Sequence, residues 1–328
     1  MNYGFLDAQN FAWKFHLVES SFLHSSVLST YEMERKLMAQ KLIDFDATYA
    51  DLFSSFKAAP EKASGDMSAG GSGVSVEHEE EDRNAEFVRT FKQNSELTSG
   101  YGVDYGLNCL NRGPSPEEAG SLFNPEGTTL CPGRIFPPIT VTRVSDARIA
   151  HLEQEVPQNG SYRIYIFGGH PATTSHALSD FSTHLLRENS FFQKYRRQDI
   201  DIRMGGEDRA KWEERHNPLS LFFTFCFVFN ARRAEVEVDE VLPGVLRRCR
   251  YLVYTDDAGR GRGAMEAAHG KVGFDVRKGG VVVVRPDGYV GCTIKLVAGN
   301  GTVEGINEYF EPIVTERIGR AAKCGVGG

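Results

Sequence analysis

The cysteines are the first side chains that could do chemistry, and their spacing argues against it. None of the six lies in a Cys-x-x-Cys pair or in a metal-ligand pattern: Cys109, Cys131, Cys226, Cys249, Cys292 and Cys324. Scattered cysteines in a chain of 328 residues favour reduced thiols over a disulfide framework. The cysteine pattern therefore indicates neither dithiol chemistry nor a zinc site.

Carboxylates and histidines give a second set of candidates, namely Asp44/Asp46, Asp256/Asp257, His170, His176 and His184. A hard cation needs several oxygen ligands, and neither aspartate pair has a second ligand cluster near it. Nucleophilic catalysis needs a nucleophile beside a base, and the histidines have neither a serine elbow nor an evident carboxylate partner. We assign no catalytic residue and no metal ligand from the sequence.

A glycine pattern, Gly259-x-Gly261-x-x-Ala264, follows an apolar segment and precedes a short helical stretch. Such a pattern can place a pyrophosphate at a helix N-terminus. Here Asp256 and Asp257 would put carboxylates where the phosphates approach. The alternation of glycine and arginine could also contact RNA, but it occurs once, in an acidic chain. A surface loop is the better interpretation.

Composition narrows the classes of partner. The net charge is -7 and the sequence pI is about 5.8, which argues against a general binder of nucleic acid or of an anionic membrane. No apolar run approaches the roughly 20 residues that span a bilayer. The first residues also lack the basic start and apolar stretch of a signal peptide. We expect a soluble, cytoplasmic protein.

Residues 7–60 are predicted to be helical. Asp7 is a candidate N-cap, and Phe11, Phe15, Val18 and Phe22 recur on one helical face. The sequence "STYE" at 29–32 fits a capping box before a second helix, which carries further apolar residues. Two helices cannot bury this much apolar surface on each other, and the sequence does not reveal a partner layer. We therefore expect residues 7–53 to be poorly protected in hydrogen exchange.

The middle of the chain is predicted to be irregular. Residues 61–82 are rich in glycine and serine and then acidic, which indicates a flexible, solvated loop. Residues 83–139 read as a connecting helix followed by an irregular segment rich in glycine, asparagine and proline. Both segments connect the helical part to the remainder.

Residues 140–328 are predicted to form a mixed sheet with flanking helices. Strands are expected at 162–169, 221–230 and 250–256, a helix at 177–189, a hairpin at 281–296, and a closing helix. Pro286-Asp287-Gly288 suits the hairpin turn, with glycine at positive φ.

This β-α-β-α-β, hairpin, helix order is that of a thioredoxin-like domain. The segment after its first strand, "FGGHPATTSHALSD", has no cysteine, so a redox role is not expected, and Cys226 reads as a small core residue. The fold class is therefore α/β.

Four stretches of the sequence together carry a family resemblance. "MNYGFLDAQNFAWKF" resembles "GMNxGxxDAxNLAWKL" of FAD-dependent aromatic hydroxylases. "LSTYEMERKLMAQKLIDFDATYADLFSS" resembles "LxTYExERxPxAxxLIDFDxxYSxLFS", which is typical of the phenol 2-monooxygenase branch. "FKQNSELTSGYGVDY" and "VVVVRPDGYVG" fit the same branch, in the family order. The resemblance covers nearly the whole chain apart from the acidic loop.

The resemblance implies an origin in a flavoprotein that hydroxylates a phenolic ring with FAD, NADPH and O2. Residues 1–60 would be a helical remnant of its flavin domain, and 140–328 its thioredoxin-like dimerisation domain, which implies a homodimer. By match to the family motif, Met1 and Asn2 would lie beside the isoalloxazine of FAD, and Gly4 and Asp7 would serve turn geometry and capping. An amide at a helix entrance can stabilise negative charge on reduced flavin.

The sequence also departs from that family. It contains none of the family's N-terminal GxGxxG dinucleotide fold, neither the family's Asp-Gly segment nor its Gly-Asp ribityl motif, so we expect no stable FAD binding by this chain alone. Met1 is expected to correspond to an internal methionine of the ancestral enzyme. Two function classes remain open. One is the C-terminal part of an aromatic-ring monooxygenase, inactive without a flavin domain. The other is a stand-alone interaction module without redox activity.

Overall fold

The computed structural model describes residues 3–57, 88–89, 102–113, 121–195, 215–258 and 268–315. The helices are α1 (Tyr3–Glu19), α2 (Ser29–Lys57), α5 (Leu152–Glu155), α6 (Pro171–Leu185), α7 (Phe191–Tyr195), α9 (Val238–Val241), α10 (Ala268–Val272) and α11 (Gly301–Phe310). Three 3-10 turns are η1 (Ser25–Leu28), η2 (Arg233–Glu235) and η3 (Gly244–Leu252). The strands are β1 (Thr140–Arg143), β2 (Ile149–His151), β3 (Tyr162–Gly169), β4 (Phe223–Phe229), β5 (Val253–Thr255), β6 (Gly280–Val284) and β7 (Val290–Ile294).

The strands form one mixed sheet in the order β2-β1-β5-β4-β3-β6-β7. The central strands β3, β4 and β5 are parallel, and the pairs on either side of them are antiparallel. Parallel strands are buried on both faces and therefore read as continuous apolar runs. This explains why all residues of β3 and β4 are buried.

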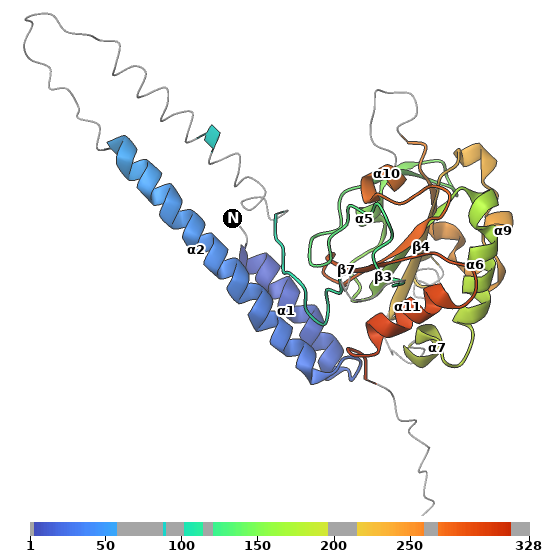
Figure 1. The fold of residues 1–328 in the computed structure, drawn as a ribbon, viewed down its shortest axis with the longest axis horizontal. Coiled ribbons are helices and arrows are strands. Elements are labelled where there is room, and N and C mark those ends of the chain that lie inside the picture. The colour runs from blue at the N-terminus through green and yellow to red at the C-terminus, as the bar shows by residue number, and fades with distance from the viewer. Residues whose placement is uncertain are drawn as a thin grey trace, which may run out of the picture.

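The two faces of the sheet pack against different layers (Figure 1). Ile164 and Ile166 of β3 point to a large aromatic core shared with α6, α7 and α11. Tyr165 and Phe167 point to the opposite core, which α5, α10 and the segment before β1 cover. The domain is a sheet covered on both sides, so the predicted α/β class is confirmed.

Most of the predicted strands are confirmed, with shifts at their ends. β3 has the predicted bounds, β4 lies inside 221–230, and β6 and β7 form the predicted hairpin. Gly288 has a φ of 89°, as the turn requires, and its amide donates to the Arg285 carbonyl at 2.9 Å. Strands β1 and β2 were not predicted, because they are three or four residues long and polar in part.

Helix α6 begins six residues earlier than the predicted start at 177. Pro171 occupies its first turn, and His170 Nδ1 accepts from the Ala172 amide at 3.3 Å. Just before it, Gly169 has a φ of 60°, and a Cβ there would meet the Val276 carbonyl oxygen at 2.5 Å. Glycine is therefore required where β3 turns into α6.

The expectation that the N-terminal helices lack a partner layer is wrong. Trp13, Leu17 and Phe22 belong to the aromatic core of the sheet domain, and the Phe22 ring stacks on Phe222 at 4.9 Å. The turn after α1 is also hydrogen-bonded to the segment after α11, where the Thr315 amide donates to the Phe22 carbonyl at 2.8 Å. The helix pair is thus anchored to the sheet domain at the turn that joins its two members.

The face that α1 buries differs from the predicted one. Its buried residues are Asn10, Trp13, Lys14 and Leu17. Phe11 and Phe15, which were predicted to share the apolar face, are 42% and 46% exposed. The periodicity is helical in both cases, but the buried stripe is displaced because it includes two polar side chains.

Both predicted caps are wrong. Helix α1 already begins at Tyr3, so Asp7 lies inside it and accepts hydrogen bonds from Arg35 Nε at 2.9 Å and Tyr31 at 3.1 Å. The Ser29 hydroxyl donates back to the Ser26 carbonyl at 2.6 Å instead of accepting from the first turn of α2. Asp7 therefore ties α1 to α2.

Helix α2 continues away from the sheet domain beyond its contact with α1 (Figure 1). No described side chain between 39 and 51 is buried. Of the helices in the described ranges, none combines the length and apolar content needed to cross a bilayer. The predicted loop at 61–82, and all but two residues of the helix expected after it, lie outside the described residues.

We expect hydrogen exchange to divide the helix pair. Amides of Trp13, Leu17 and Met38 should exchange nearly as slowly as those of the central strands, because their side chains belong to buried cores. Amides from Asp44 to Asp51 should exchange much faster, since nothing described covers them. Exchange mass spectrometry on the whole chain measures both segments at once. Equal protection along the whole of α2 would contradict this division.

Candidate functional site

A fully buried arginine lies where the β6–β7 hairpin meets the helix pair. Arg285 follows the last residue of β6 and has no solvent exposure. Its Nη1 and Nη2 donate to the two carboxylate oxygens of Glu34 at 2.7 and 3.0 Å. Its Nε and Nη2 donate to Asp287 at 3.1 and 2.6 Å, and Nη1 also donates to Asn111 at 2.8 Å. All five N–H donors of the guanidinium are therefore satisfied.

Glu34 of α2 is the acceptor that the other elements share. Lys14 Nζ of α1 donates to its Oε2 at 2.7 Å, and Asn10 Nδ2 donates to the same oxygen at 2.8 Å. Asn108 donates to Oε1 at 3.1 Å from the loop before the sheet. A buried carboxylate is tolerated when it is paired and hydrogen-bonded in this way.

We call Lys14, Glu34, Arg285 and Asp287 the ion cluster. It holds two positive and two negative charges and so is neutral overall. Trp13 closes one side, because its Nε1 donates to Asp287 at 2.9 Å and its ring lies 5.4 Å from the guanidinium carbon. The cluster thus joins α1, α2 and the hairpin through a single guanidinium.

Burial and mutual charge move the pKa values of the cluster. Burial lowers the pKa of Lys14 to about 8, with Arg285 acting in the same direction. Burial alone would raise the pKa of Glu34, but the neighbouring Arg285 and Lys14 outweigh it and lower this pKa to about 2. Glu34 is therefore held as a carboxylate at neutral pH.

The helix pair also carries exposed apolar side chains. We call Phe5, Phe11, Phe15, Met33, Leu37 and Ile43 the outer face; these side chains are 39–73% exposed. Phe11 stacks on Phe15 at 5.4 Å and contacts the edge of Tyr31 at 5.2 Å. A groove of about 560 Å³ continues from Phe5 along α1 to Trp13 and Pro286 of the hairpin. Exposed aromatic side chains that contact one another, as Phe11 and Phe15 do, are typical of an interaction surface.

The sequence-predicted cofactor residues are not placed. Met1 and Asn2 lie outside the described residues, as does the Gly259-x-Gly261-x-x-Ala264 pattern. Gly4, which follows them, lies in the first turn of α1. In the described ranges no group of three or more His, Cys, Asp or Glu side chains could hold a metal ion. Cys226 is fully buried in the core, as predicted, and burial raises the pKa of its thiol well above the usual value.

Asp256 forms a buried pair that the sequence did not indicate. His269 Nε2 accepts from the Gly169 amide at 3.1 Å, so Nδ1 carries the proton and donates to Asp256 at 2.8 Å. Both side chains are fully buried. Because Nε2 is already occupied by a backbone amide, His269 has no free nitrogen with which to act as a base. Its role is to fix the end of β3 against α10.

The ion cluster was missed because its members are far apart in the sequence. Glu34 and Arg285 are separated by 251 positions. One signal was present: each member lies in a stretch that carried the family resemblance, namely "AWKF", "TYEMER" and "RPDGY". The sequence analysis interprets Pro286-Asp287-Gly288 as a hairpin turn and gives Arg285 no separate role. The turn is present in the structure, and it also brings the charged side chains of Arg285 and Asp287 into contact with the helix pair.

We predict that E34Q lowers the free energy of unfolding by about 3–5 kcal/mol at pH 7, because it leaves Lys14 buried without its charge partner and leaves Arg285 with Asp287 alone. The loss should depend on pH. Since the pKa of Glu34 falls from 4.5 to about 2 on folding, its stabilisation is complete above pH 4.5 and disappears as the pH falls towards 2. Urea unfolding of both proteins between pH 3 and 7 measures the difference.

The matched control is E32Q, since Glu32 is exposed on the same helix. It should change the free energy of unfolding by less than about 0.5 kcal/mol at every pH. A difference between wild type and E34Q that stays constant from pH 7 to pH 3 would show that the Glu34 charge is not what stabilises the cluster.

Comparison with known proteins places this fold in a family. Residues 103–318 match the family described as "Phenol hydroxylase, C-terminal dimerisation domain". An FAD-dependent monooxygenase (terD) of Aspergillus terreus is 24% identical, with 97% of this chain and 46% of that protein covered. A 3-hydroxybenzoate 4-monooxygenase of Comamonas testosteroni is 28% identical, with 95% and 43% covered. A phenol 2-monooxygenase (fsqG) of Aspergillus fumigatus is 24% identical, with 95% and 44% covered.

The chain therefore spans less than half the length of these curated relatives, and what it matches is their C-terminal part. The family match itself covers more than half of the chain. The protein belongs to the phenol hydroxylase family and carries its C-terminal dimerisation domain.

Proposed function

We propose that this chain supplies the dimerisation and helix-positioning part of an FAD-dependent monooxygenase that hydroxylates phenolic rings with NADPH and O2. The observation that carries the proposal is the ion cluster. It fixes α1, the helix whose head would lie beside the flavin, to the hairpin of the family domain. Met1 and Asn2 would form that head. Catalysis would require a flavin-binding part in addition.

The described residues fit an FAD site only as one wall. The groove beside Phe5 and Ala8 is mostly apolar and offers no cluster of donors for a pyrophosphate or a ribityl chain among the described side chains. FAD carries its own redox chemistry, and the protein must supply binding, orientation and exclusion of water. This chain's contribution would be to orient α1 and to exclude water along the outer face. We derive no catalytic step from it.

The outer face supports the same proposal. Its aromatic side chains are exposed although they follow one another along the helix pair, and burying each would contribute about 1.5–3 kcal/mol. A flavin-binding part packed there would cover them. The proposal includes a cytoplasmic location, where buried thiols such as Cys226 and Cys249 remain reduced.

A second candidate is a stand-alone dimerisation or interaction module with a thioredoxin-like fold and no redox activity. It is favoured by the anchored helix pair, which needs no further domain to hold its turn in place. The nucleotide sequence upstream of Met1 distinguishes the two candidate functions. In-frame coding sequence upstream of Met1 with a Gly-Asp ribityl motif supports the enzyme part, and a transcript that starts at Met1 after a stop codon supports the module.

We predict that this chain, purified alone, holds no FAD near stoichiometry. The reason is that the phosphate and ribityl contacts of a flavin need donors beyond the groove on α1. Absorbance between 350 and 500 nm after incubation with FAD and desalting measures the bound fraction, with about one flavin per chain as the contradicting outcome.

We also predict a homodimer formed through the sheet domain. The match to a dimerisation domain supports it. Size-exclusion chromatography with light scattering gives the mass at micromolar concentration, against 36.4 kDa for the single chain. The variant F11S/F15S, on the outer face, should leave the dimer intact; a monomer at all concentrations would contradict the prediction.

A further inference from the structure

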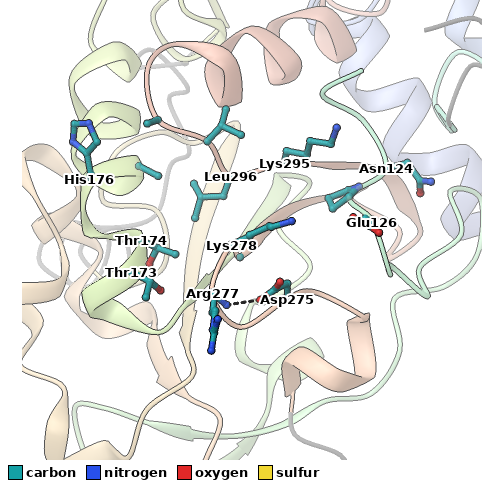
Figure 2. A pocket seen from close by; sticks show the side chains of 15 residues that line it. Asn124, Glu126, Thr173, Thr174, His176, Asp275, Arg277, Lys278, Lys295 and Leu296 are labelled. Carbon is teal, nitrogen blue, oxygen red and sulfur yellow. Dashed lines mark hydrogen bonds between the residues drawn. The ribbon is translucent and has the colours of Figure 1, made fainter. Parts of the chain in front are cut away.

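A cleft of about 770 Å³ opens beside the sheet, away from the ion cluster. Figure 2 shows it between the first turns of α6, which carry Thr173 and His176, and the turn at Asn124 and Glu126. The Asn124 amide donates to the Thr293 carbonyl at 2.9 Å, which holds this turn against β7. Four separate segments therefore build the walls on a rigid frame.

The floor of the cleft is apolar and its rim is charged. Leu296 lies between the two walls and is 5% exposed, with Ala177 of α6 beside it in the lining. Arg277, Lys278 and Lys295 contribute cations from the two ends of the β6–β7 hairpin. Among the described residues, none of these three cations is within ion-pair distance of a carboxylate.

The charge count sets the valence of a ligand. Three cations line the cleft, and the carboxylates of Glu126 and Asp275 line it too, which leaves an excess of one positive charge. A monoanion would neutralise this excess, whereas a dianion would leave the cleft with a net negative charge. This local excess stands out in a chain whose net charge is -7.

The volume of the cleft limits the size of the ligand that it can hold. Small-molecule sites are typically about 300–1,000 Å³, mostly apolar, with a few polar groups that orient the ligand. An inorganic anion would leave most of this cleft, and the whole apolar floor, without contact. The start of α6 adds little by itself, because His170 already accepts from the amides of Ala172 and Thr173. The cations and the floor together define the site.

We propose that this cleft binds a small aromatic monocarboxylate, with its carboxylate at Lys278 and Lys295 and its ring on Leu296 and Ala177. Arg277 extends the cationic rim. The ring would bury the apolar floor, and its face can also receive a cation. The site is separate from the α1 groove, so it does not depend on the proposed monooxygenase role.

The test uses the whole chain and three probes, namely benzoate, its neutral isostere benzamide, and inorganic phosphate. Isothermal titration calorimetry should give a Kd for benzoate of about 1 mM or tighter, which is within ordinary ligand efficiency for about nine heavy atoms. Benzamide should bind at least about tenfold more weakly, because it lacks the charge. Phosphate should neither bind measurably nor displace benzoate.

Two variants locate the binding. K278M/K295M should weaken benzoate at least about tenfold, and A177F should abolish binding by filling the floor while keeping every charge. The matched control is K194M, an exposed lysine on α7 of the same domain, which should bind as wild type does. Near-ultraviolet circular dichroism checks that each variant is folded.

Equal affinity for benzoate and benzamide would overturn the proposal, and so would unchanged benzoate binding in folded K278M/K295M. Stoichiometric binding of phosphate would show that the cleft is a site for inorganic anions instead. Loss of benzoate binding in K194M would show that general surface charge, and not the cleft, attracts the ligand. Because none of these measurements uses flavin or dimerisation, their failure leaves the proposed function untouched.

Discussion

The buried guanidinium of Arg285 is the constraint on which the arrangement of this molecule depends. A charge placed out of water must have all its donors satisfied, and the partners of Arg285 come from α2, the loop at Asn111 and its own hairpin. Lys14 adds α1 through Glu34. Moving any one of these elements would leave a buried charge unpaired. The helix pair and the sheet domain are therefore held in one relative position. A buried cluster of this kind fixes that position more than it adds to the net free energy of folding.

The same constraint divides the helix pair into two sides with different roles. On its buried side, α1 presents polar groups that are specific in direction: Asn10 and Lys14 donate to Glu34 of α2, and Trp13 donates to Asp287 of the hairpin. The pair also presents the outer face, which is apolar and 39–73% exposed. A helix pair built this way acts as a connector, because its orientation is fixed on one side and its burial is incomplete on the other.

The features that could be predicted from the sequence are those that depend on residues close together in the chain. β3 and β4 were predictable, since strands buried on both faces read as continuous apolar runs. The Gly288 turn was predictable because its chemistry is local. The buried face of α1 was not, because Asn10 and Lys14 count as polar until their partner Glu34 is known. The cleft was missed for the same reason: its cations precede β6 and follow β7, and its walls are α6 and the turn at Glu126.

Strand β6 connects the cleft to the ion cluster, the two features that could not be predicted from the sequence. Lys278 of the cleft precedes its first residue, Gly280, and Arg285 of the ion cluster follows its last, Val284. The five residues of β6, about 17 Å of strand, lie between them. β6 is paired on both edges, with β3 and with β7, so it cannot bend independently at either end. A ligand in the cleft and a partner on the helix pair would thus bind opposite ends of one rigid strand. Neither would need the other to be present, because each end is completed by its own set of contacts.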